Sequence, residues 1–226
     1  STGKMSKSKG EFLTVSLLEQ KGYNPLAYRL FCLQSHYRKQ LVFTYDALDN
    51  ATNAYEKLKN KVKSLKENID GEYRVIDAYR CSISPCLDCR FCWENNGCAI
   101  NDEMQEIYDY IQISDNILIA SPIFFSELTG KLLDVGSRLQ TYFCATFFRK
   151  EKPIAKSKKG AVVLVGGGDG NMRKPYETAC TLLHHMNCYN IHDVVFSHNT
   201  NIRPAIEDEQ VLNGIHSIID FFNDGQ

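Results

Sequence analysis

The chain has 226 residues, of which 43% are hydrophobic and 23% are charged, the proportions of a globular protein with a sizeable core. Its net charge of −1 gives no overall attraction to nucleic acid or to an anionic membrane. No apolar run approaches the roughly 18 residues of a membrane span, and residues 1–10 lack the apolar stretch of a signal peptide. We therefore expect a cytoplasmic protein without a membrane or nucleic-acid partner.

The first third of the chain predicts helices with one short strand between them. A helix is expected over residues 24–34, because Pro25 suits a first helical turn. Residues 41–45 are apolar and β-prone, which favours a strand. Apolar residues then recur every three or four positions over residues 49–66, which predicts an amphipathic helix.

The remaining sequence alternates between strand and helix patterns. Strands are expected at residues 73–79, 116–121, 161–165 and 193–196, and helices at 102–113, 126–143, 175–186 and 207–222. This alternation predicts an α/β fold with a doubly wound parallel sheet. Ligands of such sheets bind beyond the carboxyl ends of the strands, which here lead into the loops at residues 121–126 and 166–171.

Cysteines are unusually frequent, with nine in the chain. In a reducing compartment, a cysteine cluster indicates metal or redox chemistry more often than disulfides. Cys86, Cys89, Cys92 and Cys98 follow the spacing C-x2-C-x2-C-x5-C, which suits the four thiolate ligands of a 4Fe–4S cluster. Zinc bound by the same four thiolates and a set of free thiols are the two alternatives.

An ordered set of motifs then suggests a family for residues 70–226. It comprises Ser84-Pro85-Cys86, the Asn101 to Met104 motif, Ala120-Ser-Pro-Ile-Phe-Phe125, Gly166-Gly-Gly-Asp-Gly-Asn171 and Asp208-Glu209. This region resembles the flavodoxin-like NAD(P)H-dependent FMN reductases and iron–sulfur flavoproteins. The resemblance implies bound FMN, electrons from NAD(P)H or a reduced carrier, a small-molecule acceptor and a homo-oligomer. It also implies that the flavin ring is contacted by Ser121, Pro122, Ile123, Phe124, Phe125, Ser126, Gly166, Gly167, Gly168 and Asn171.

The N-terminal third resembles a different family. Lys4-Met-Ser-Lys-Ser8, Gly22-Tyr-Asn-Pro25 and the later Ser35-His-Tyr-Arg38 are similar to the corresponding segment of bacterial cysteinyl-tRNA synthetases. The resemblance implies that Lys4 and Lys7 contact ATP. The nucleotide-binding histidine motif and the zinc-held cysteine pocket of that family have no counterpart in this sequence, so aminoacylation is not expected.

The two resemblances meet between residues 65 and 70, whereas the domain boundary is expected near residue 41. We expect residues 1–40 to be a helical, synthetase-derived extension and residues 41–226 to be the FMN-binding domain. In that domain, residues 41–70 replace the first strand, phosphate loop and helix, and Asn50 and Thr52 donate to the FMN phosphate. Asp46 and Asp49 in the same stretch would repel it. An FMN-dependent oxidoreductase, with an optional 4Fe–4S cluster, is thus the leading function. A truncated cysteinyl-tRNA ligase with residual ATP or tRNA binding and an inactive rearranged product are the alternatives.

Overall fold

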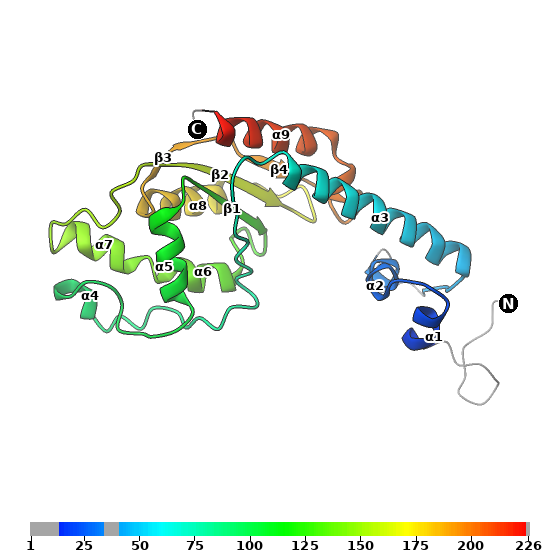
Figure 1. Cartoon of the computed structure of the whole chain (residues 1–226), viewed down its shortest axis with the longest axis horizontal. Coiled ribbons are helices and arrows are strands. Elements are labelled where there is room, and N and C mark those ends of the chain that lie inside the picture. The colour runs from blue at the N-terminus through cyan, green and yellow to red at the C-terminus, as the bar shows by residue number, and fades with distance from the viewer. Residues whose placement is uncertain (1–13, 34–40, 225–226) are drawn as a thin grey trace. The chain divides into compact units, whose positions relative to one another are not determined.

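The computed structural model of the chain describes residues 14–33 and 41–224, so Lys4 and Lys7 lie outside the described residues. The chain divides into two compact units, Ser1–Asn68 and Ile69–Gln226 (Figure 1). In the described ranges, no helix combines the length and the apolar character that crossing a membrane requires.

The first unit is built from helices, as predicted for the N-terminal region. It contains α1 (Val15–Gln20), α2 (Pro25–Leu33) and α3 (Tyr45–Glu67). Leu18, Phe31, Leu48 and Ala51 are buried in its small core, with half-buried aromatic rings around them. Because each of the three helices contributes at least one side chain to this core, the helices depend on one another for their burial.

The strand predicted at residues 41–45 is wrong, because α3 begins within it. The Thr44 hydroxyl accepts a hydrogen bond from the Ala47 N–H (3.1 Å), and the Thr44 carbonyl accepts one from the Leu48 N–H (3.1 Å). This cap starts the helix, and the helical burial of Leu48 then outweighs the β propensity of the preceding residues. The predicted phosphate loop is wrong for the same reason, since Asn50 and Thr52 lie inside α3.

The second unit contains a parallel sheet of four strands. They are β1 (Asn116–Pro122), β2 (Lys158–Val165), β3 (Cys188–Ile191) and β4 (Val195–Ser197). β2 pairs in parallel with each of the other three, and Ile119 of β1 lies opposite Val162 of β2. This parallel arrangement confirms the predicted fold class.

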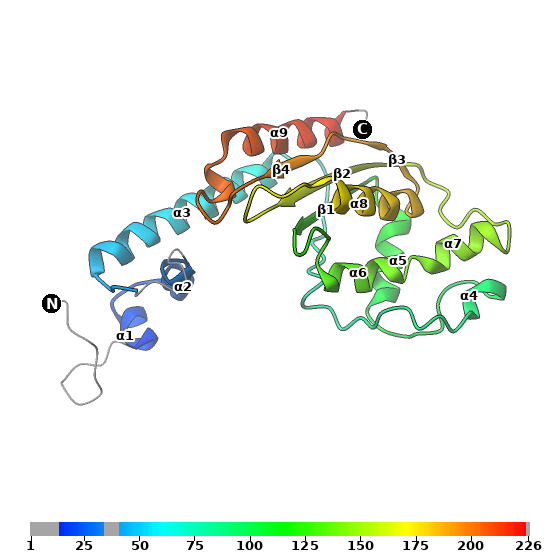
Figure 2. The same ribbon diagram turned by 180° about the vertical axis from the view of Figure 1, so that it is seen from behind.

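Helices cover both faces of this sheet (Figures 1 and 2). Val162 and Leu164 point into the main core, which also contains residues of α5 and α8, whereas Ala161 packs with Val211 and Ile218 of α9 on the other face. This alternation along β2 is what a doubly wound sheet requires. The helices of this unit are α4 (Phe91–Glu94), α5 (Met104–Ile113), α6 (Gly130–Ser137), α7 (Gln140–Phe147), α8 (Arg173–His185), the 3-10 turn η1 (Ala205–Glu207) and α9 (Glu209–Asn223).

One edge of the sheet is formed by β1. Within the described part of the chain, no strand pairs with the side of β1 opposite β2, and Leu118 is 48% exposed there. The strand predicted at residues 73–79 is wrong, because this segment joins no ladder and ends in a turn at residues 78–80. A strand needs a hydrogen-bonded neighbour, and residues 41–45, predicted as the preceding strand, do not form one.

Candidate functional site

The carboxyl ends of β1, β2 and β4 lead into loops at one edge of the sheet, because these strands are parallel. The loop after β2 is tied to the loop after β4. The Gly166 N–H donates to the Ser197 carbonyl (2.8 Å), the Thr200 N–H to the Gly166 carbonyl (3.1 Å) and the Asn199 N–H to the Gly168 carbonyl (3.0 Å). The predicted glycine loop is therefore fixed by a second loop that the sequence did not single out.

Gly167 lies close to the side chain of Asn201. An added Cβ would lie 2.8 Å from the Asn201 side-chain amide nitrogen, so this exposed side chain would have to shift to admit it. The N–H groups of Gly167 and Gly168 have no acceptor among the described residues, whereas the carbonyls of both are engaged by the Asn199–Asn201 backbone. The loop thus offers two neighbouring donors to the polar edge of a flat ligand.

The loop after β1 contains a tight, strained turn. Phe124 and Glu127 exchange two backbone hydrogen bonds (both 3.0 Å), and between them Phe125 and Ser126 have φ angles of 51° and 59°. Two positive φ angles are the pattern of a type I′ turn, which glycine or asparagine normally occupies. The Phe125 ring is nonetheless fully exposed. Strained backbone conformations of this kind cluster at functional sites.

Phe125→Gly should raise the free energy of unfolding by about 0.5–1 kcal/mol, because glycine adopts a positive φ without the steric cost of a Cβ. Chemical denaturation of the two proteins measures the change. Phe125→Ala is the matched control, since it removes the exposed ring but keeps the strained backbone, and it should leave stability unchanged. Equal stabilisation by both variants would show that the ring, and not the turn, carries the cost.

Three other residues that are predicted to contact the flavin make hydrogen bonds within the protein that fix the loops. The Ser121 hydroxyl donates to the Pro122 carbonyl (2.8 Å) and accepts from the Thr129 N–H (3.2 Å). The Ile123 N–H donates to the Val165 carbonyl (2.8 Å), and the Asn171 side chain accepts from the Arg173 N–H (2.8 Å). Their contacts with a ligand stay predictions, and so do those of Pro122, Phe124 and the glycines.

The four clustered cysteines line one cavity of about 20 Å³, which is close to the space of one water molecule. All four are free thiols, and no group of three or more metal-ligating side chains in the described ranges is arranged around a metal position. Burial, together with a hydrogen bond to the Cys144 thiol, raises the pKa of Cys92 to about 12. The thiols thus share a cavity without being assembled as a metal site.

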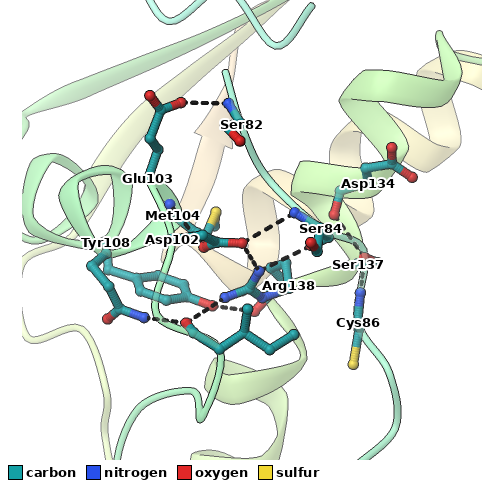
Figure 3. Close-up of polar contacts among 12 residues, drawn as sticks. Ser82, Ser84, Cys86, Asp102, Glu103, Met104, Tyr108, Asp134, Ser137 and Arg138 are labelled. Atoms are coloured by element: carbon teal, nitrogen blue, oxygen red, sulfur yellow. Dashed lines mark hydrogen bonds and ion pairs between the residues drawn. The ribbon is translucent and has the colours of Figure 1, made fainter. Parts of the chain in front are cut away.

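A buried arginine holds the cysteine loop in place (Figure 3). The Arg138 guanidinium donates to the Ser84 carbonyl (2.9 Å), the Asp102 carboxylate (2.7 Å) and the Ile100 carbonyl (3.1 Å). It therefore ties together both ends of the segment that carries the four cysteines. Further bonds fix the middle of the loop, from the Cys86 N–H to the Ser137 hydroxyl (2.9 Å), from the Thr141 hydroxyl to the Gly97 carbonyl (2.8 Å) and from Arg149 to the Cys92 carbonyl.

The sequence did not single out Arg138, which lies between α6 and α7. The single helix predicted over residues 126–143 is wrong, because α6 ends at Ser137 and α7 begins at Gln140. Between them, the Arg138 carbonyl accepts a hydrogen bond from the Tyr108 hydroxyl (2.8 Å). Helical periodicity could have identified this arginine. It follows Val135 by three residues and precedes Tyr142 by four, so it lies on an apolar helical face, where a charged residue indicates a buried role. Its Nε is buried without a hydrogen-bond acceptor among the described residues, and Arg138 is one of the residues that line the cysteine cavity.

Asp102 links this network to acid stability. Burial alone would raise the pKa of Asp102, but the Arg138 guanidinium and the N–H groups of Ser84 and Met104 together hold it below its ordinary value. Because the pKa of Asp102 is lower in the folded protein than in the unfolded chain, its carboxylate stabilises the fold fully above the unfolded pKa of about 3.9. This stabilisation is lost as the pH falls from there through the lower pKa of the folded protein. Urea unfolding at pH 6 and pH 3 should show a smaller acid loss in Arg138→Met than in the parent. Identical losses would contradict this role of the pair.

Comparison with known proteins gives matches to both parts of the chain. A family model described as NADPH-dependent FMN reductase matches residues 43–201, which is more than half of the chain. The cysteine–tRNA ligase of Novosphingobium aromaticivorans is 53% identical over 66 residues, covering 29% of this chain and 13% of the ligase. The iron–sulfur flavoprotein of Methanosarcina thermophila is 27% identical over 103 residues, covering 45% of this chain and 51% of that protein.

Among solved structures, a flavone reductase is similar with a TM-score of 0.51 and 19% identity, over 73% of this chain and 56% of that one. At this identity the likeness shows the fold alone. The chain spans only 13% of the ligase and about half of the flavoprotein. Together these matches confirm that two unrelated families are joined in one chain, as the motifs predicted.

Proposed function

We propose, because this chain belongs to the family of NADPH-dependent FMN reductases, that it is an oxidoreductase that moves electrons from NAD(P)H to a small-molecule acceptor through a flavin. The observation that carries the proposal is the carboxyl edge of the sheet, with its two glycine donors and its strained, exposed Phe125. A bound flavin supplies the redox chemistry, accepting two electrons and a proton as NAD(P)H becomes NAD(P)+.

The residues of this edge fit the flavin ring. The N–H groups of Gly167 and Gly168 would bond the polar edge of the ring, and the absence of a side chain lets the ring approach the backbone. Phe125 would cover an apolar face of the ring and exclude water from it. Phe125→Ala is therefore expected to weaken flavin binding while leaving stability unchanged, which separates binding from folding.

We further propose that the cysteine loop holds a 4Fe–4S cluster. The donor set is right in kind, since four thiols line one cavity, but the thiols must move outward because about 20 Å³ does not hold a cluster. The unpaired Nε of Arg138 supports the proposal, because a buried positive group beside the thiols favours an anionic cluster. Aminoacylation is not proposed, since the matching stretch spans only 13% of a ligase.

The visible absorption spectrum of protein purified without oxygen tests both proposals, with flavin, iron and zinc assayed on the same sample. Flavin bands with about four irons per chain are expected. Flavin without iron would overturn the cluster and leave the flavin proposal standing, and zinc in place of iron would identify the alternative metal. No flavin binding, even after riboflavin or FMN is added, would overturn the proposed function.

A further inference from the structure

The cationic side chains around the carboxyl edge of the sheet are already paired with carboxylates. Lys174 lies 3.4 Å from Glu127, and Arg203 lies 2.7 Å from Asp208. The same is true of the two other cations in these loops and the helices that follow them, Arg173 with Glu177 (2.8 Å) and Lys131 with Asp134 (3.6 Å). A phosphate group at this edge would therefore compete with a carboxylate for every lysine or arginine in the described loops.

Some polar groups near these loops and in α3 also have partners within the chain. At the start of α8, the Asn171 side chain accepts from the Arg173 N–H (2.8 Å). In α3, the Thr52 hydroxyl donates to the Leu48 carbonyl (2.8 Å) and the Asp49 carboxylate accepts from the Tyr23 hydroxyl (2.7 Å). Of the two donors predicted for the FMN phosphate, Thr52 is thus engaged within its own helix, while the ring donors at Gly167 and Gly168 are open.

We propose that this site recognises the flavin ring and gains nothing from the phosphate, so that its ligand class is flavins in general and riboflavin binds at least as tightly as FMN. The inference rests on the proposed function, since it concerns the same site. A flavin held only by its ring exchanges with solution, so it would act as a diffusible substrate and not as a permanently bound group.

The local charges indicate which of the two flavins, FMN or riboflavin, should bind more tightly. The phosphate of FMN carries about −1.5 to −2 charges near pH 7. Glu127, Asp169 and Asp208 lie in or next to the same loops, so FMN should bind equally or up to about threefold more weakly than riboflavin. Added salt screens this repulsion, so FMN affinity should rise toward that of riboflavin. A phosphate clamp would give the opposite salt dependence.

Fluorescence titrations of the full chain with riboflavin and with FMN, at low and high ionic strength, test the inference. Similar dissociation constants for the two flavins, with FMN binding unchanged or tightened by salt, are expected. FMN binding tighter than riboflavin by about tenfold or more and weakened by salt would overturn the inference but leave the proposed function intact. Absence of binding for both flavins would instead overturn the proposed function.

A charge variant sharpens the test. Glu127→Gln releases Lys174 from its ion pair, so FMN should gain about threefold or more in affinity relative to riboflavin. Asp115→Asn is the matched control, because it releases Lys156 from an ion pair of 2.6 Å at the opposite end of β1 and β2. A shift of the same size in both variants, or in neither, would contradict the assignment of the phosphate preference to these paired cations.

Discussion

Replacing Arg138 with methionine should lower the free energy of unfolding by about 3–5 kcal/mol, the cost of breaking a buried ion pair by removing one partner. The Arg138 side chain is 0% exposed, and its loss leaves the Asp102 carboxylate without its cation. The carbonyls of Ser84 and Ile100 lose their donor at the same time. Since those two carbonyls flank the cysteine loop, the loop should loosen before the rest of the unit unfolds.

Denaturant unfolding and hydrogen exchange of residues 84–100 measure this effect. Arg173→Met is the matched control, because its ion pair with Glu177 has side chains that are 80% and 61% exposed. That control should change stability by less than about 1 kcal/mol and leave exchange in the cysteine loop unaltered. A loss below about 1 kcal/mol in Arg138→Met would contradict the anchoring role.

Leu48→Ala should cost about 2.7–5 kcal/mol, the range for truncating a fully buried leucine. The core of the first unit contains few buried side chains, so this loss should unfold α1, α2 and α3 together. The sheet and its helices have a separate core and should remain folded. Hydrogen exchange followed by peptide mass analysis reports the two units separately.

Leu183→Ala in the core of the second unit is the reciprocal variant, since Leu183 is also 0% exposed. It should raise exchange in the sheet and leave α1–α3 protected. Val42→Ala, at a side chain that is 56% exposed, should alter neither unit. Simultaneous loss of protection in both units of either core variant would contradict their independence.

The sequence predicted the parts of the fold whose local pattern and tertiary packing agree. Residues 116–121 and 161–165 are continuous apolar runs, and both form strands of the parallel sheet. Residues 41–45 and 73–79 have equally good β propensity, yet neither forms a strand. The first is overridden by the Thr44 cap, and the second lacks a partner, which no local pattern can reveal.

The candidate site was predictable only in part, for a similar reason. Glycine runs and clustered cysteines mark their loops in the sequence itself. The contribution of Asn199–Asn201 depends on the pairing of β2 with β4, which sequence spacing does not give. The anchoring role of Arg138 depends on its contacts with Ser84 and Asp102. These partners lie 54 and 36 residues away in the sequence, so local sequence patterns do not reveal them.

The unpaired edge of β1 has a consequence for handling the protein. Alternate residues of a strand direct their backbone groups to opposite edges, and since Asp115 and Ile123 bond to β2, the groups of Asn116, Leu118 and Ala120 point to the open side. Residues 116–121 include no charged residue and no bulge, and the strand's proline, Pro122, stands only at its last position; charges, prolines and bulges are the features by which natural edge strands resist aggregation. Concentrated samples are therefore at risk of edge-to-edge association at β1. Leu118→Lys would place a charge on this edge and should reduce that association.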